Sequence, residues 1–300
     1  MSIPKNHHYV SRSLIDKFIN INNSFFVYDK HKEKHYTQKS SRRIFSENDL
    51  NTIIDKEGNI NQEEVENVLN LNFEQDFPIH YEKINNLLQD NDDSYLSKIS
   101  ESGELEESVT YLLRHGIIGV FRNPIETSTT NDAILEAFET IGENASDKLK
   151  KEISTLNDYY KPVKNKFYIN FKKLCDRIIE NMGECVFSIF IAPLDDFFIL
   201  PDSTSFHERA NLIDDVIYNG QILSSPSMSV VRVGYPINSR IFIMIESKKI
   251  SLNKTNRLLH IDSSFVLTIN KILYSAANSK IICKSEVYLK SLITSLSSDN

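Results

Sequence analysis

The sequence has 300 residues and a formal net charge of −7, with 40% hydrophobic and 25% charged residues. This composition is ordinary for a globular protein and excludes extended disorder, and the chain is long enough to bury a large core without disulfides. The polar start of the chain lacks the apolar core of a signal peptide, and no later run reaches the roughly 18 apolar residues of a membrane span. We therefore expect a cytoplasmic protein with no membrane partner.

The first 60 residues predict a small mixed unit, and the next 120 a helical region. Residues 13–19 resemble a short helix, and apolar runs within 24–37 predict a β-hairpin. Asn61, followed three positions later by Glu64, is typical of a capped helix start. Apolar residues at helical spacing predict a long amphipathic helix over 105–121. Further helices are expected at about 131–142, 146–160 and 164–181.

The last part of the chain is rich in β-branched and aromatic runs, which predict buried strands. These runs occupy 184–191, 197–200, 229–233 and 240–245, and helical spacing returns at 265–273 and 286–292 around a short strand at 281–283. We predict an α+β fold in a single large domain, 1–300. Its sub-regions are an N-terminal hairpin unit (1–60), a helical region (61–182) and an antiparallel or mixed sheet with flanking helices (183–300).

Metal and cofactor signatures are weak. The segment from Asp55 to Glu64 imitates a calcium loop, but Ile53 occupies the first ligand position, so a turn leading into a capped helix is favoured. The eight histidines and three cysteines show no zinc-ligand spacing. No phosphate-binding glycine motif or nucleophile elbow is present. The sequence predicts no metal site and no cofactor.

Lysines and aromatic residues are interleaved over 148–173, which is a pattern that suits a nucleic-acid groove. Lys164, Lys166 and Tyr168 are the candidate binding residues there. The simpler alternative is a pair of amphipathic helices with solvated lysines and core aromatics, and the net charge of −7 favours this alternative.

Polar residues also stand at the ends of apolar elements, where functional sites are often built. These clusters are His8-Tyr9-Val10, Arg122-Asn123-Pro124, Pro201-Asp202-Ser203-Thr204 and Tyr235 to Ser239. Each has a structural alternative, since Arg122 suits a helix C-cap and Asp202 suits a turn.

Taken in order, the clusters resemble a bacterial and phage family called domain of unknown function 4238. Its opening motif, His-Tyr-Val-Pro-x-x-Tyr-Leu-x-x-Phe, is similar to the segment from His8 to Phe18, with Ser11 in place of proline. Its Arg-x-Pro is similar to Arg122-Asn123-Pro124, and its Phe-Ile-Thr-Ser-Asp-Asn-Pro to the segment from Phe198 to Thr204. The family's later motifs resemble Pro236-Ile237-Asn238 and the helix that contains Asn270.

The resemblance covers nearly the whole chain and retains five polar residues: His8, Glu74, Arg122, Asp202 and Asn270. If His8, Arg122 and Asp202 converge, a histidine oriented by Asp202 would transfer protons beside an arginine that binds an anionic oxygen. Glu74 and Asn270 would be binding residues. The leading hypothesis is a nuclease-like effector in antiviral defence that acts without metal on RNA or DNA. The alternative is a non-enzymatic interaction protein, with a protein partner, in which the same residues form a buried polar network.

Overall fold

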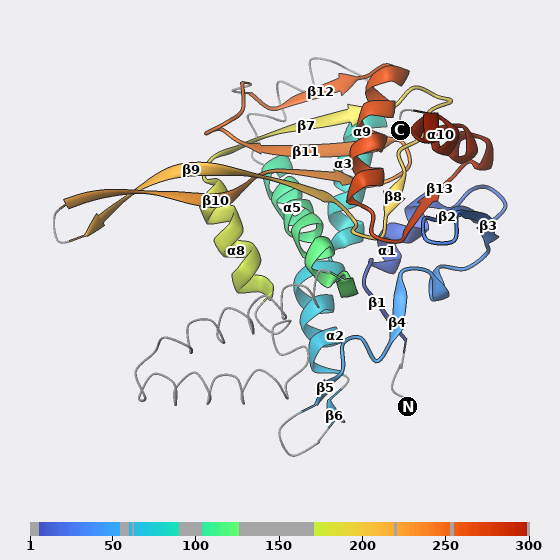
Figure 1. Ribbon diagram of the computed structural model, residues 1–300, viewed down its shortest axis with the longest axis horizontal. Coiled ribbons are helices and arrows are strands. Elements are labelled where there is room, and N and C mark those ends of the chain that lie inside the picture. The colour runs from blue at the N-terminus through green and yellow to red at the C-terminus, as the bar shows by residue number, and fades with distance from the viewer. Residues whose placement is uncertain are drawn as a thin grey trace.

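The computed structural model describes residues 6–54, 60–61, 63–89, 104–125, 171–218, 221–252 and 255–298. The expected helices at 131–142 and 146–160, most of the calcium-like loop, and residues 164–170 lie outside these ranges. Within them, helices and sheets combine in the predicted α+β fold, with sheets in the N- and C-terminal regions and helices between (Figure 1).

The largest sheet has five strands in the order β12-β7-β11-β10-β9. All neighbours are antiparallel except β12, which pairs parallel with β7, so the sheet is mixed. The paired strands β9 and β10 extend well beyond the other strands as a two-stranded arm (Figure 1). The bounds are β7 Cys185–Ile191, β9 Phe206–Tyr218, β10 Gln221–Pro236, β11 Ile241–Ser247 and β12 Arg257–His260.

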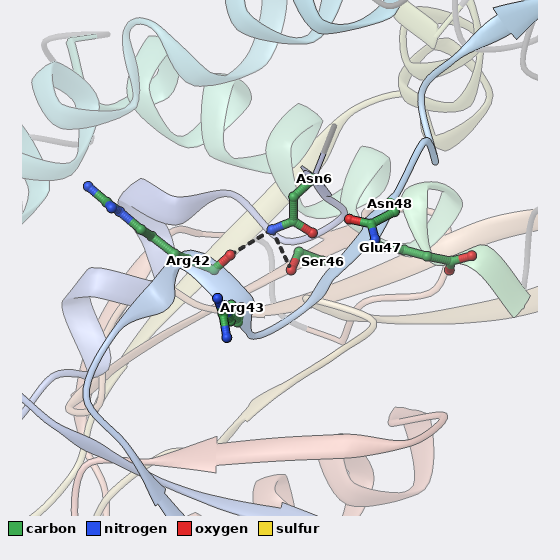
Figure 2. A pocket seen from close by; sticks show the side chains of 6 residues that line it. All are labelled: Asn6, Arg42, Arg43, Ser46, Glu47 and Asn48. Carbon is green, nitrogen blue, oxygen red and sulfur yellow. Dashed lines mark hydrogen bonds between the residues drawn. The ribbon is translucent and has the colours of Figure 1, made fainter. Parts of the chain in front are cut away.

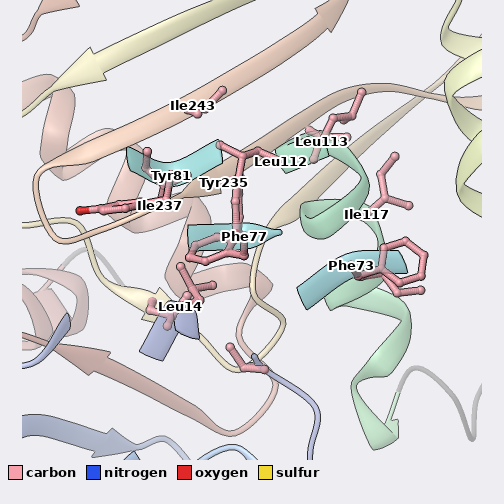
Figure 3. Packing of buried hydrophobic residues seen from close by; sticks show 14 of the residues in the cluster. Leu14, Phe73, Phe77, Tyr81, Leu112, Leu113, Ile117, Tyr235, Ile237 and Ile243 are labelled. Atoms are coloured by element: carbon pink, nitrogen blue, oxygen red, sulfur yellow. The ribbon is translucent and has the colours of Figure 1, made fainter. Parts of the chain in front are cut away.

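Helices cover both faces of this sheet. Successive side chains of each strand point to opposite faces, and apolar side chains of β7 and β11 are present on both. On one face, Ile189 and Ile243 belong to a core cluster shared with α5 and α8, part of which is drawn in Figure 3. On the other face, Phe190 and Phe242 pack with α9 and α10 in a second cluster. The helices are α2 Glu64–Leu69, α3 Phe77–Gln89, α5 Glu104–Arg122, α8 Phe171–Met182, α9 Ser263–Ala276 and α10 Glu286–Ser298.

The predicted N-terminal hairpin is confirmed as β2 (Phe25–Asp29) and β3 (Lys34–Gln38). It does not stand alone, because β2 also pairs with β13 (Lys280–Cys283), which pairs in turn with β8 (Leu200–Pro201). The first and last parts of the chain therefore share one four-stranded sheet. The remaining short elements are β1 Asn6–His8 paired with β4 Ser46–Asn48, β5 Ile53–Ile54 paired with β6 Ile60–Asn61, α1 Arg12–Ile15, and the single turns Asp16–Phe18, Ser41–Arg43 and Asn70–Glu74.

The prediction of a strand over 197–200 is wrong in its extent. The strand is confined to Leu200–Pro201, although Phe198 and Ile199 are buried as expected. The amide of Ile199 donates to the side chain of Asn270 and not to a neighbouring strand. The capping box expected from Asn61 and Glu64 is shifted, because the N-cap of α2 is Glu63. The Asn61 side chain nevertheless accepts from the Glu64 amide and donates to the Glu64 carboxylate.

Candidate functional site: a polar junction around His8

Asp202 follows β8 and holds a turn against the start of β13. Its two carboxylate oxygens accept hydrogen bonds from the amides of Asn278, Ser279 and Lys280 at 2.8, 2.8 and 3.2 Å, and from the Ser279 hydroxyl at 2.6 Å. The residue is buried. Four donors to one carboxylate fix the turn firmly, because a charged acceptor makes strong hydrogen bonds.

The C-terminal end of α5 packs against this turn. Gly119 lies so close to Thr204 that an added Cβ would be 2.3 Å from the threonine Cβ, so the approach requires glycine. One turn further along, the Asn123 side chain donates to the carbonyl of Asp202 at 3.1 Å. The end of α5 is thereby fixed beside the Asp202 turn.

Arg122, the last residue of α5, connects two other segments to this junction. One guanidinium nitrogen donates to the Glu74 carboxylate at 2.5 Å, and the other donates to the main-chain carbonyl of His8 at 2.5 Å. The arginine side chain is 4% exposed and that of Glu74 25%. Burial alone would raise the pKa of Glu74, but the charge and hydrogen bond of Arg122 outweigh burial and lower it.

A buried histidine–tyrosine pair lies within the electrostatic reach of this ion pair. The hydroxyl of Tyr235 on β10 is 2.7 Å from Nδ1 of His115 on α5. Burial lowers the pKa of His115 to about 4, while the charges of Glu74 and Arg122 act on it in opposite directions. Burial also raises the pKa of Tyr235 far above its ordinary value, so both groups are neutral at pH 7.

The imidazole of His8 is held by Ser41 and not by Asp202. Its Nε2 is 2.9 Å from the carbonyl oxygen of Ser41. A carbonyl only accepts, so Nε2 carries the proton and Nδ1 of the neutral ring keeps its lone pair. Burial lowers the pKa of His8, and the bond to Ser41 only partly opposes this effect. His8 is therefore neutral at pH 7, in one defined tautomer.

An open surface pocket of about 680 Å³ adjoins the strand that carries His8. It is lined by Asn6, Arg42, Arg43, Ser46, Glu47 and Asn48 (Figure 2). Asn6 and His8 alternate with the buried His7 along β1, so they lie on the same face of that strand. His8 is paired with Ser46, and its ring is bonded to Ser41, the residue before Arg42.

Asn270 performs a separate task on the opposite side of the five-stranded sheet. Its amide accepts from the Ile199 amide at 3.1 Å and donates to the Phe197 carbonyl and the Tyr288 hydroxyl at 2.8 and 3.0 Å. It is fully buried. These bonds hold the segment that leads into β8, and through it they support the Asp202 turn.

The structure thus brings His8, Glu74 and Arg122 into contact and connects Asp202 to them through Asn123, while Asn270 lies elsewhere. Burial and the nearby charge of Asp202 also raise the pKa of Tyr9, which follows His8. Lys164, Lys166 and Tyr168 lie outside the described residues.

Sequence reasoning placed Asn123 in a polar cluster without foreseeing its partner Asp202. It missed Ser41 and did not single out the adjacent arginines Arg42 and Arg43. The two arginines were visible as a basic pair in the sequence. The hydrogen bond from the His8 ring to the Ser41 carbonyl had no signal in the sequence, because every residue has a main-chain carbonyl.

In the described ranges, no three histidine, cysteine, aspartate or glutamate side chains gather in a way that could hold a metal ion. None of the helices described is both long and apolar enough to cross a membrane.

These features define an α+β protein in which a polar junction connects the N-terminal segment, the end of a central helix and a turn between two sheets. The model of the family described as "Protein of unknown function (DUF4238)" matches residues 6–286, and the chain belongs to this family. The match confirms the resemblance seen in the sequence. No curated protein and no solved structure matches the chain.

Proposed function

We propose that this protein is a nuclease-like effector that cleaves RNA by acid–base catalysis, with His8 as the general base. The observation that carries the proposal is the state of His8: a half-buried neutral imidazole, oriented by the Ser41 carbonyl so that the lone pair of the ring is on Nδ1. A positioned histidine that is unprotonated near neutral pH is well suited to remove a proton.

RNA is the favoured substrate because it contains its own nucleophile, the ribose 2′-hydroxyl. Nδ1 of His8 would take the 2′-hydroxyl proton while a bond forms between O2′ and phosphorus. The bond between phosphorus and O5′ breaks, and the leaving oxygen takes a proton from water or from the imidazolium. The products are a 2′,3′-cyclic phosphate and a 5′-hydroxyl, and no ion is required for this atom balance.

Arg122, Glu74 and Asp202 then act as positioning residues. Arg122 donates to the His8 carbonyl and to Glu74, so its guanidinium is already engaged. The Asp202 carboxylate accepts four hydrogen bonds from residues 278–280. Both residues support the segment that carries His8, and this role differs from the direct catalytic one expected from the sequence.

A second candidate, a non-enzymatic interaction protein, is favoured by the burial of Asp202 and Asn270. Buried, mutually bonded side chains are what a purely structural network requires. In that case His8 would be a further member of the network, and its loss would act through stability alone.

The test is incubation of purified protein with labelled single-stranded RNA and DNA of the same sequence, with and without chelator. We expect RNA cleavage to cyclic-phosphate ends, no DNA cleavage, and loss of cleavage in His8→Ala. The matched control is His31→Ala, which removes an exposed histidine. Intact RNA, or equal cleavage by His8→Ala and the wild type, would refute the proposal. The defence role is tested by phage restriction in cells that express the same three proteins.

A further inference from the structure

Two arginine side chains, those of Arg42 and Arg43, line the pocket that adjoins β1, the strand that carries His8. Arg42 and Arg43 are both exposed, and in the described part of the chain neither side chain makes a hydrogen bond or an ion pair. Figure 2 shows both on the same side of Asn6, with Glu47 and Asn48 on the other side. Uncommitted arginines contrast with Arg122 and Arg232, which are engaged in ion pairs.

The backbone that carries these two arginines is held in place by neighbouring side chains. Nδ2 of Asn6 donates to the Arg42 carbonyl at 2.7 Å and to the Ser46 hydroxyl at 3.1 Å. Ser40 caps the same turn by accepting from the Arg42 amide at 3.2 Å. The ring of His8 reaches the Ser41 carbonyl between them. The turn that fixes the tautomer of His8 is thus the turn that presents the two arginines.

We propose that Arg42 and Arg43 form a phosphate subsite that holds the backbone of single-stranded RNA next to His8. Guanidinium groups match phosphate oxygens in geometry and charge, and they are less strongly hydrated than lysine ammonium groups. The pocket is open, as a strand that passes through it requires, and the Asn48 amide adds a further polar group to its wall. This assignment rests on the proposed function and names the residues that contact the substrate. It is tested by measuring RNA binding and not turnover.

Glu47 offers a test in which the affinity for RNA should rise and not fall. Its carboxylate lines the same pocket and is exposed. A negative charge there opposes a phosphate, so Glu47→Gln should strengthen RNA binding. A gain of affinity cannot result from partial unfolding, whereas a loss can.

The experiment measures equilibrium binding of a fluorescent 2′-O-methyl RNA octamer to the wild-type protein and to variants over a range of salt concentrations. This probe keeps the phosphates but lacks the free 2′-hydroxyl, so cleavage does not interfere. We expect Arg42→Ala/Arg43→Ala to weaken binding by about tenfold or more. The slope of log K against log salt should fall by about 1.4, because each phosphate contact to a single strand contributes about 0.7. The control Arg177→Ala/Arg209→Ala removes two exposed arginines elsewhere and should bind like the wild type.

Equal loss of affinity in the two double variants would overturn the assignment, since binding would then be spread over the surface charge. The assignment would also be overturned if a nucleoside monophosphate displaced the octamer at a much lower concentration than unlabelled RNA does. The pocket would then be a site for a free nucleotide. Inorganic phosphate should compete only weakly, since it offers one phosphate and the strand several. Binding as expected without cleavage of ordinary RNA would refute the proposed function but leave the subsite intact. Cleavage that is unaffected by loss of both arginines would refute the subsite but leave the proposed function intact.

Discussion

Replacing Arg122 by methionine should destabilise the fold more than any exposed arginine substitution. The side chain is 4% exposed, and its two terminal nitrogens bond Glu74 and the His8 carbonyl, each at 2.5 Å. Methionine fills much of the same volume but donates nothing. The substitution therefore leaves a largely buried carboxylate and a main-chain carbonyl without their donors.

The magnitude follows from this geometry. Removing one partner of a buried ion pair costs about 3–5 kcal/mol. Water can reach part of Glu74, whose side chain is 25% exposed, so the low end of that range applies. The unpaired carbonyl adds about 1 kcal/mol, which gives a loss of about 4 kcal/mol in all. For a protein of this size the melting temperature should fall by about 6–10 °C.

The assay is chemical and thermal denaturation of Arg122→Met, Glu74→Leu and the double variant, with Arg177→Met as the exposed control. Glu74→Leu should cost at least as much as Arg122→Met, because it leaves the more deeply buried charge unpaired. The double variant should be more stable than the sum of the two losses predicts, since the ion pair is lost only once. A loss below about 0.5 kcal/mol for Arg122→Met, the range of ordinary surface substitutions, would refute the reasoning.

Three further predictions concern stability. Ile117 on α5 is fully buried, so Ile117→Asp should prevent recovery of folded protein. The control Ile21→Asp, at a position that is 94% exposed, should be tolerated. A soluble Ile117→Asp variant that unfolds cooperatively would contradict this packing of α5. Asp202→Ala should lower stability by about 2–4 kcal/mol in urea denaturation because four donors lose their acceptor, and an unchanged midpoint would contradict this. His115 has a folded-state pKa of about 4 against 6.5 when unfolded, so the unfolded state binds its proton first and stability should fall as pH is lowered from 6.5 to 4. His115→Gln should flatten that decline relative to the wild type, and parallel pH profiles would contradict the assignment.

The elements best predicted from the sequence are those with strong local patterns. The long helix α5 has apolar residues at helical spacing, and the strands β7 and β11 are nearly continuous apolar runs of strand length. The strands β9 and β12 were missed. Their sequences mix apolar with charged residues, and their pairing with distant strands is not encoded locally.

The segment at 197–200 shows why composition alone misleads. Phe198 and Ile199 are as apolar as strand residues, and they are buried. Their backbone, however, is held by the Asn270 side chain and the Ser239 carbonyl, and these take the places of strand partners. Burial was predictable from the sequence, whereas hydrogen-bond partners 40 or more residues away were not.

The site was predictable to a similar degree. Polar residues that end apolar elements indicated His8, Arg122 and Asp202, and the structure gathers their segments at one junction. Their individual tasks depend on main-chain groups such as the Ser41 carbonyl and the amides of residues 278–280. These groups have no signature in a sequence, so the proposed division between a base and its supporting residues rests on the geometry.

The most direct test of the central claim, that His8 acts chemically while its neighbours position it, is a paired measurement on His8→Gln. Glutamine can still donate to the Ser41 carbonyl, so the fold should be retained. RNA cleavage and melting temperature would be measured on the same preparation. We predict that cleavage is abolished while the melting temperature stays within about 2 °C of the wild type. Unchanged cleavage, or cleavage lost only in proportion to unfolded protein, would contradict the account.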